Sequence, residues 1–308
     1  MDLKEVCFMK SITVDKINSM AENKPCEFIE KCENEFYKKI DRIAEKILKE
    51  EIKYIFLTGP SSSGKTTFSS ILLKRLSSKK TFDISLDNYY KLKKEMPRRK
   101  NNDYNFETIK SLKVDDMKKD FLMLKNGEEV LIPIIDFASD DRKEKREKVQ
   151  VTDNTVVLIE GIHALNSKIT NLFKDEKILK IFIMPEPVIK VGESYISKYD
   201  LRFVRRMVRD YYYRYSDVFN SFKLWKYVRL GEVQFMANYK KRADIIENTY
   251  LDYETCVLKK HALKQLYKVG KDSIHYIKAR RIINFLEKFS DLDDALVPKN
   301  SLLKEFIK

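Results

Sequence analysis

Cysteine, histidine and long hydrophobic runs are all scarce in this sequence. Only three histidines exist to complete a zinc site. The four cysteines show no CxxC spacing, which also argues against zinc; they are Cys7, Cys26, Cys32 and Cys256. We therefore expect no structural metal site, and we expect the thiols to be buried or idle.

The longest apolar runs, 54–57 and 156–159, fall far short of the roughly 20 residues that cross a bilayer. Asp2, Lys4 and Glu5 interrupt the start of the chain, so that it does not resemble a secretory leader. These features predict a cytoplasmic protein with no membrane contact.

Positive charge is abundant, with 61 lysines and arginines against 47 acidic residues and a formal net charge of +14. Such an excess can bind nucleic acid, solvate the protein surface or bind a phosphate-rich ligand such as ATP. Composition alone does not distinguish these three alternatives. The 308 residues, 43% of them hydrophobic, allow one sizeable core and an appended lobe. We expect an N-terminal extension (1–50), a catalytic domain (51–270) and a helical C-terminal tail (271–308).

The pattern of apolar residues predicts an α/β fold with a parallel sheet between helices. Apolar residues at helical spacing predict a helix that starts near Phe28 and ends near Glu51. Strand Ile52–Thr58, a glycine loop and helix Ser63–Ser77 follow. Three further short runs are predicted strands: Phe82–Leu86, Val156–Ile159 and Ile178–Met184.

Two β-rich runs, Val130–Asp136 and Lys148–Thr152, predict an antiparallel ribbon around the charged, loop-like stretch Asp140–Glu147. From Asp200 onward the pattern is almost entirely helical. The predicted helices there are Leu201–Arg214, Ala243–Leu266 and Ile274–Phe289.

The stretch Gly59-Pro-Ser-Ser-Ser-Gly-Lys-Thr fits GxxxxGK[ST] and lies between a predicted strand and a predicted helix. Such a loop aims backbone N–H groups at phosphate, and the helix N-terminus adds its positive dipole end. Lys65 would bridge the β- and γ-phosphates of ATP, and Thr66 would ligate Mg²⁺. The predicted nucleotide-binding residues here are Gly59, Pro60, Ser61, Ser62, Ser63, Gly64, Lys65, Thr66 and Thr67.

Two carboxylates follow predicted strands. Asp87, after the second strand, could accept the proton of an attacking hydroxyl, or it could be a plain Asp-Asn turn residue. Glu160 ends a buried strand and could support Mg²⁺ through water, or it could simply face solvent.

Arginines crowd the helix Leu201–Arg214, and few acidic partners are expected nearby. They are Arg202, Arg205, Arg206, Arg209 and Arg214. A mobile arginine lid over ATP is one interpretation, and a solvated basic face or a nucleic-acid patch is the other.

The order of these motifs resembles the uridine kinase and phosphoribulokinase family over about residues 50 to 270. The segments that carry the resemblance are Gly59–Thr67, Ser85-Leu-Asp-Asn-Tyr-Tyr, Asn105-Phe-Glu, Ile132-Pro-Ile-Ile-Asp-Phe, Ile159-Glu-Gly-Ile-His and Arg205-Arg-Met-Val-Arg-Asp. Trp225-Lys-Tyr-Val-Arg-Leu-Gly-Glu and Ala243-Asp-Ile-Ile-Glu-Asn further resemble long bacterial uridine-kinase-like proteins, whose N-terminal half this sequence lacks.

The resemblance implies an ATP- and Mg²⁺-dependent kinase of a nucleoside-like acceptor, with Asp87 as base and Glu160 in the metal shell. Glu107 would hold ribose hydroxyls, and Arg206 would reach the nucleoside. Arg209 and Arg214 would hold ATP phosphates. Together with Lys65 these assignments give the expected catalytic set Asp87, Lys65 and Arg209.

Two positions on the ribbon depart from the family, which places a tyrosine and a histidine where this chain has Ile135 and Asp140. Ile135 offers no hydroxyl, and an ionised Asp140 cannot donate a hydrogen bond. The acceptor thus stays open between a nucleoside and a non-nucleoside sugar or sugar phosphate.

A non-catalytic nucleotide-sensing or RNA-binding module is the rival of another class, although a nucleic-acid partner is disfavoured. A homo-oligomer stays open. His163 and Trp225 are interpreted as structural residues.

Overall fold

The structure is a computed structural model that describes residues 11–136 and 141–308, and side chains outside 136–145. The chain forms two compact units, each described by itself. We call the first the sheet unit (Tyr37–Met184 and Leu224–Glu247). The second, the helical unit, comprises the described residues up to Phe36 together with Pro185–Lys223 and Asn248–Lys308.

The sheet unit is built on five strands in the order β10-β7-β2-β6-β3. The strands are β2 (Tyr54–Thr58), β3 (Lys80–Ser85), β6 (Thr155–Glu160), β7 (Ile178–Met184) and β10 (Ile245–Asn248). The pairs β2–β6, β2–β7 and β3–β6 are parallel, as predicted. Every residue of β2 and β6 is buried, which explains why these central strands are continuous apolar runs.

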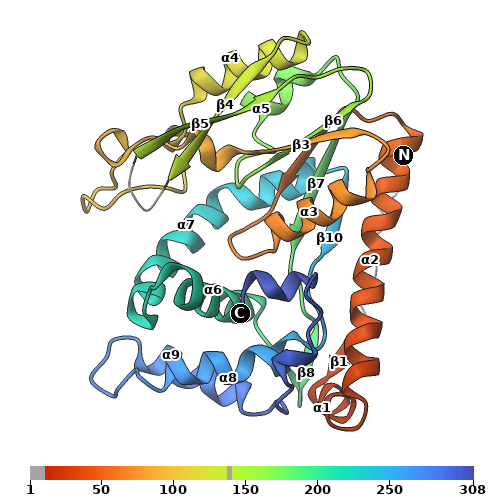
Figure 1. Cartoon of the computed structure of the whole chain (residues 1–308). Coiled ribbons are helices and arrows are strands. Elements are labelled where there is room, and N and C mark those ends of the chain that lie inside the picture. The colour runs from red at the N-terminus through yellow and green to blue at the C-terminus, as the bar shows by residue number, and fades with distance from the viewer. Residues whose placement is uncertain (1–10, 137–140) are drawn as a thin grey trace. The chain divides into compact units, whose positions relative to one another are not determined.

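Helices flank this sheet (Figure 1). Their bounds are α2 (Pro25–Lys49), α3 (Lys65–Arg75), α4 (Val114–Lys125), α5 (Ser167–Thr170) and α7 (Val218–Arg242). Two of the boundaries between the units fall within α2 and α7, and the other two fall at the end of β7 and within β10. The core of the sheet unit gathers aromatic side chains, with the Phe173 ring 4.6 Å from Tyr54 and 5.3 Å from Phe56.

The predicted ribbon is present, but its second strand is longer than expected. β4 (Val130–Asp136) pairs antiparallel with β5 (Asp141–Val149), with a register shift between Pro133 and Ile134. The charged stretch predicted as a loop is therefore mostly strand, and the second strand ends at Val149 rather than at Thr152. Cross-strand pairing with β4 overrides the low strand propensity of its charged residues.

The helical unit contains a small sheet, in which β1 (Ile12–Thr13) pairs parallel with β8 (Ile189–Val191) and β8 pairs antiparallel with β9 (Ser194–Tyr195). Its helices are α1 (Val14–Asn23), α6 (Lys198–Arg214), α8 (Glu254–Leu266) and α9 (Tyr276–Leu286).

The prediction of one helix from Ala243 to Leu266 is wrong. Ile245–Asn248 forms strand β10 beside β7, and the helix begins only at Glu254. Asp244 explains the break, because its backbone N–H donates to Lys180 O (2.8 Å) and its side chain accepts from Lys180 N (2.8 Å). These bonds attach the segment to a sheet edge, where tertiary pairing outweighs helical periodicity.

Within the described ranges, no helix combines the length and the apolar character that a membrane crossing requires. Cys32 and Cys256 are buried and Cys26 is exposed, all as free thiols, while Cys7 lies outside the described residues. Burial raises the pKa of both Cys32 and Cys256 to about 12, so these two thiols stay protonated, as the prediction of idle cysteines requires.

Candidate functional site

The predicted phosphate-binding loop is wound tightly between β2 and α3. A Cβ on Gly59 would lie 2.3 Å from the Ile183 carbonyl oxygen and 2.7 Å from Ser63 Oγ, so only glycine fits there. Gly64 has a φ of +85°, a left-handed conformation that favours glycine. Ser62, at a φ of +60°, accepts the same conformation without being glycine. The loop therefore has the winding that can direct backbone N–H groups toward an anion.

Lys65 and Thr66 occupy the first turn of α3, directly after this loop. Lys65 Nζ donates to the carbonyl oxygens of Gly59 (3.0 Å) and Pro60 (3.3 Å), so its side chain folds back over the loop. Thr66 is exposed, whereas Ser62 and Ser63 are buried. The ammonium group and the accessible hydroxyl thus both lie next to the loop, where their chemistry is compatible with phosphate and metal binding.

Two of the predicted carboxylates lie at the same edge of the sheet as the loop. Glu160 is the last residue of β6 and is aligned with Leu57 of β2 and Ser85 of β3. Asp87 lies in the 3-10 helix Leu86–Tyr89, directly after β3, and is exposed. Because parallel strands end at one edge, the loop after β2, Glu160 and Asp87 share that edge.

The oxygen donors at this edge fit Mg²⁺, which prefers a few carboxylate or hydroxyl ligands completed by phosphate and water. Thr66 supplies a hydroxyl and Glu160 a carboxylate that is 9% exposed. In the described part of the chain, no group of three or more His, Cys, Asp or Glu side chains could hold a metal by itself. A magnesium ion here would therefore depend on the phosphates of its nucleotide.

Tyr90 joins Asp87 to the segment that carries Glu107. Its hydroxyl donates to the Phe106 carbonyl oxygen (2.9 Å), which ties the residue before Glu107 to the end of the 3-10 helix. Burial raises the pKa of Tyr90 well above its usual value, and the charges of Asp87 and Glu107 raise it further. Both carboxylates thus lie within electrostatic reach of one buried phenol, and the structure brings together these two predicted acceptor-site residues.

The ribbon reaches the same region through Ile135. The backbone N–H of Ile135 donates to Asn88 Oδ1 (3.4 Å), next to Asp87. The side chain of Ile135 is half-buried and presents only methyl groups. The other ribbon position of interest, Asp140, lies outside the described residues. One of the two departures from the family pattern is therefore placed beside the proposed base.

In α6 of the helical unit, three of the predicted arginines surround a single acid, Asp210. Asp210 Oδ2 lies 3.2 Å from Arg206 Nε, and Oδ1 lies 3.0 Å from an Arg209 guanidinium nitrogen and 3.5 Å from Arg214 Nε. Asp210 is 2% exposed. The expectation of few acidic partners is wrong, because the motif that contains the arginines also contains their counter-ion.

Arg205 differs from these three arginines. It is fully buried and bonds both oxygens of Glu254 (2.7 and 2.5 Å) and the Thr249 carbonyl oxygen (2.8 Å). This bidentate pair lies wholly within the helical unit and stabilises it, so Arg205 is structural. The assignment of Arg206, Arg209 and Arg214 to ligands stays a prediction.

Gly231, which was not among the predicted site residues, lies in α7 against Glu107. A Cβ added at Gly231 would lie 2.5 Å from Glu107 Cβ and 3.1 Å from Glu107 Oε2. Tyr227, one turn earlier, accepts a hydrogen bond from Asn101 (2.7 Å) and donates one to Asp103 (2.5 Å). A glycine within the almost entirely helical pattern after Asp200 is the signal that could have indicated a close approach here, although not its partner.

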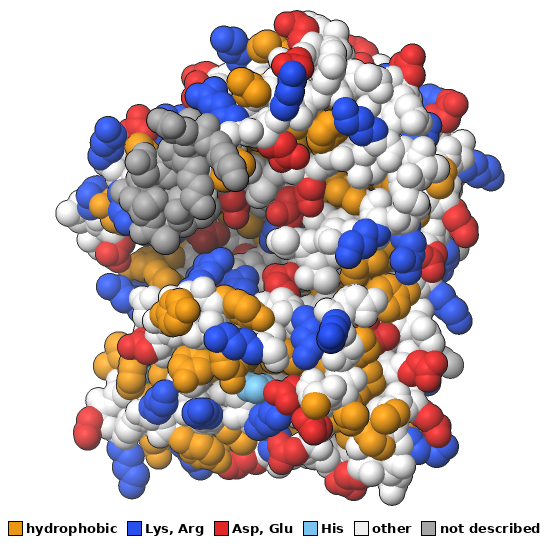
Figure 2. Space-filling view, viewed as in Figure 1, with side chains coloured by type: hydrophobic (Ala, Val, Ile, Leu, Met, Phe, Trp, Pro, Cys, Tyr) orange, Lys and Arg blue, Asp and Glu red, His pale blue; other side chains and the backbone are white. Residues whose placement is uncertain are grey.

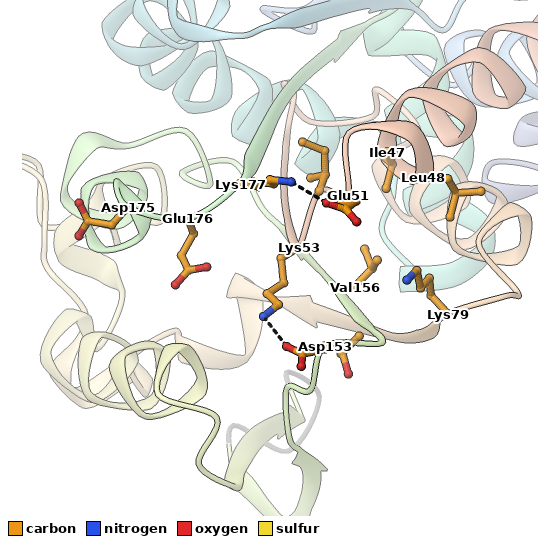
Figure 3. Close-up of a pocket in the computed structure, with 12 residues that line it drawn as sticks. Ile47, Leu48, Glu51, Lys53, Lys79, Asp153, Val156, Asp175, Glu176 and Lys177 are labelled. Carbon is orange, nitrogen blue, oxygen red and sulfur yellow. Dashed lines mark hydrogen bonds and ion pairs between the residues drawn. The ribbon is translucent and has the colours of Figure 1, made fainter.

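A surface depression of about 390 Å³ lies at the opposite edge of the sheet, near the starts of β2, β6 and β7. Figure 3 shows Lys177 paired with Glu51 (2.7 Å) and Lys53 paired with Asp153 (3.5 Å) among its lining residues. No predicted site residue lines it. Two of its three lysines, Lys53 and Lys177, already have carboxylate partners, so it is a poor candidate for the phosphate site.

The excess of positive charge does not gather into one patch on the face in Figure 2, where Lys and Arg are interspersed with Asp and Glu. Such mixing is typical of a solvated surface rather than of a nucleic-acid footprint.

Comparison with known proteins agrees with this arrangement. Residues 54–255 match the model of the phosphoribulokinase / uridine kinase family. A uridine kinase of Schizosaccharomyces pombe is 29% identical over 199 residues, which cover 64% of this chain and 40% of that protein. A uridine kinase of Saccharomyces cerevisiae is 28% identical over 272 residues, which cover 82% of this chain and 51% of that protein.

A uridine kinase of Staphylococcus aureus is 31% identical over 199 residues, which cover 62% of this chain and 85% of that protein. The chain thus spans about half or less of the two yeast proteins and most of the staphylococcal one. Because the family model covers the strands, the phosphate loop and both strand-end carboxylates, the chain belongs to the phosphoribulokinase / uridine kinase family.

Proposed function

We propose that this protein is a cytoplasmic kinase that transfers the γ-phosphoryl group of ATP to a hydroxyl of a small, nucleoside-like acceptor. One observation carries the proposal: the phosphate loop, Glu160 and Asp87 share one edge of the sheet, and Tyr90 links Asp87 to Glu107. This arrangement supports phosphate binding on one side and hydroxyl binding on the other.

Each residue has a distinct role in the proposed reaction. Asp87 accepts the proton of the acceptor hydroxyl as its oxygen attacks the γ-phosphorus, and the bond to the β-phosphate oxygen breaks to release ADP. Lys65 neutralises charge on the β- and γ-phosphates. Thr66 and Glu160 would hold Mg²⁺, which supplies further neutralisation when it is bound.

Glu107 is proposed to hold sugar hydroxyls, because a carboxylate accepts two hydrogen bonds from a diol. Arg206 is proposed to contact the acceptor, and Arg209 and Arg214 the phosphates. Their support is the resemblance of the motif that contains them, together with the guanidinium chemistry that suits phosphate oxygens.

Ile135 favours a second candidate, a kinase of a non-nucleoside sugar or sugar phosphate. An isoleucine beside Asn88 cannot hydrogen-bond a base, and an apolar surface discriminates weakly among ligands. We therefore expect uridine and cytidine to be no better as acceptors than other compounds that carry the same sugar hydroxyls.

The test is acceptor-dependent ADP release with Mg²⁺ATP and, in turn, uridine, cytidine, adenosine and free ribose. We expect turnover with at least one acceptor and comparable kcat/KM values among those that react. A value for uridine more than about a hundredfold above the rest would show that other residues rebuild a uracil site. Salt-dependent RNA binding with no ADP release for any acceptor would instead favour the RNA-binding module.

A further inference from the structure

Glu107 lies in an irregular segment rather than in a helix or strand, so contacts from other parts of the sheet unit must fix its position. The segment runs from Pro97 to Thr108, and the 3-10 helix Ile109–Ser111 follows it. Ser111 Oγ donates to the Asn105 carbonyl oxygen (2.5 Å), and Tyr90 donates to Phe106 (2.9 Å). These bonds fix the segment on the side of Asp87. Its other side lies against α7 at Gly231 and against the loop that follows β6.

His163 lies in that loop, three residues after Glu160, and is 1% exposed. Its Nδ1 lies 3.0 Å from the Tyr239 hydroxyl of α7. Its ring meets Phe235 of α7 edge to face, with the centroids 5.4 Å apart. Gly231, Phe235 and Tyr239 recur at intervals of four residues, so a single stripe of α7 contacts both Glu107 and His163.

The imidazole of His163 also faces the backbone of Glu107 and Thr108. Burial lowers the pKa of His163 to about 4, although the backbone of Glu107 and Thr108 acts to raise that pKa. Nε2 nevertheless makes no hydrogen bond of ordinary geometry to any described residue. Nε2 is thus a buried polar atom of a ring that lies near the backbone that carries Glu107.

The partners of Tyr239 identify the tautomer of His163. The Asn166 amide donates to the Tyr239 oxygen (3.1 Å), so the phenol proton is available for Nδ1 of a neutral imidazole. The proton of the ring then lies on Nε2, where the backbone carbonyls of Glu107 and Thr108 can only accept.

We propose that His163 is a positioning residue for the acceptor site: through Nδ1 it is anchored to Tyr239 of α7, and its buried imidazole, which lies next to the backbone of Glu107 and Thr108, supports the segment that carries Glu107. The inference rests on the proposed function for its kinetic consequence, but the positioning itself can be measured without any acceptor. It also assigns a role to α7, the helix that contains the Trp225–Glu232 motif.

The experiment is hydrogen–deuterium exchange of the full chain, followed by mass spectrometry of peptides that cover 99–111 and, as an internal reference, 59–72. In His163→Leu, which keeps an apolar side chain in the core, we expect exchange in 99–111 to become about tenfold faster, with 59–72 unchanged. His163→Gln can donate and accept at similar positions and should restore much of the protection. His275→Leu, in the helical unit, is the matched control.

Kinetics with uridine and with ribose provide the second measurement. We expect KM for the acceptor to rise about tenfold in His163→Leu while KM for ATP stays constant. If neither compound releases ADP even in the wild type, the exchange result still decides the positioning role, and only the acceptor assignment fails.

Tyr239→Phe provides a second test in case His163→Leu does not fold, because this substitution removes one hydroxyl and leaves the ring in place. It should also accelerate exchange in 99–111 and shift the ¹⁵N signals of His163 away from the Nε2–H tautomer. Unchanged exchange in 99–111 in folded His163→Leu, or in Tyr239→Phe, would overturn the proposal.

Discussion

Within the sheet unit, the phosphate side and the acceptor side are built in different ways. The proposed phosphate side consists of nine consecutive residues, Gly59 to Thr67, which follow strand β2 and extend into the first turn of helix α3. The acceptor side draws Asp87, Ile135 and Glu107 from separate segments and fixes Glu107 through Tyr90 and Gly231. A motif of consecutive residues can stay unchanged while residues in separate segments are substituted. This difference is consistent with a phosphate loop that fits the family pattern and a ribbon that departs from it.

The largest expected effect is on the phosphate side. Lys65→Ala removes the ammonium group that would neutralise the β- and γ-phosphates, and we expect acceptor-dependent ADP release to fall by at least about a thousandfold. Lys65 is half-buried and bonds carbonyl oxygens of the loop rather than the core, so the fold should persist, as far-ultraviolet circular dichroism can check. Near-normal turnover in the folded variant would refute the role of the loop.

Asp87→Asn tests the point where the two sides meet. The amide keeps the shape of the carboxylate but cannot accept the hydroxyl proton, so kcat should fall about a hundredfold or more while ATP affinity changes little. Steady-state kinetics and equilibrium ATP binding separate the two effects. Weaker ATP binding at unchanged kcat would assign Asp87 to the nucleotide instead.

A pH titration tests the acceptor side through His163, whose pKa is about 4 in the folded protein against an ordinary 6.5. Between these values the unfolded chain binds a proton that the folded chain does not, so the free energy of unfolding decreases as pH falls from 6.5 toward 4. The full shift corresponds to ~3 kcal/mol. Urea unfolding at pH 7 and pH 5 should show that the wild type loses ~2 kcal/mol more than His163→Leu. Equal losses in the two proteins would contradict a buried neutral imidazole.

The smallest effect is expected from Gly231→Ala. Alanine favours a helix by about 1 kcal/mol over glycine, but here its Cβ would lie 2.5 Å from Glu107 Cβ. Displacement of Glu107 should raise KM for the acceptor about tenfold, whereas KM for ATP should stay constant. Gly270→Ala is the matched control, because a Cβ there meets nothing within 4 Å. If both glycine variants behave alike, Glu107 does not depend on its contact with α7.

The same contrast explains what the sequence could predict. The run from β2 through the loop to α3 was predicted to within a few residues, because apolar periodicity and glycine chemistry act locally there. Strand β10 was predicted as helix, because Asp244 and Lys180, which decide it, are far apart in the sequence. The second ribbon strand was predicted at Lys148–Thr152 but spans Asp141–Val149, for a similar reason: pairing with β4 determines its length.

For the candidate site, the sequence identified the chemical groups but not what holds them. Asp87, Glu160 and Lys65 follow from strand ends and a motif, and the structure places them at one edge of the sheet. The contact partners of Gly231 and of His163 could not be derived, because each contact joins residues more than 60 positions apart in the chain. Periodicity carries no information about such pairings.

The shared counter-ion of α6 has a consequence for the balance between stability and binding. Arg206, Arg209 and Arg214 all lie within 3.5 Å of Asp210, so one carboxylate interacts with three positive charges. Because they share this acid, a change at Asp210 would alter the electrostatic environment of all three arginines at once. If these arginines contact an anionic ligand, as proposed, Asp210 competes with that ligand for them, and binding would weaken ion pairs that hold the arginines in the folded protein.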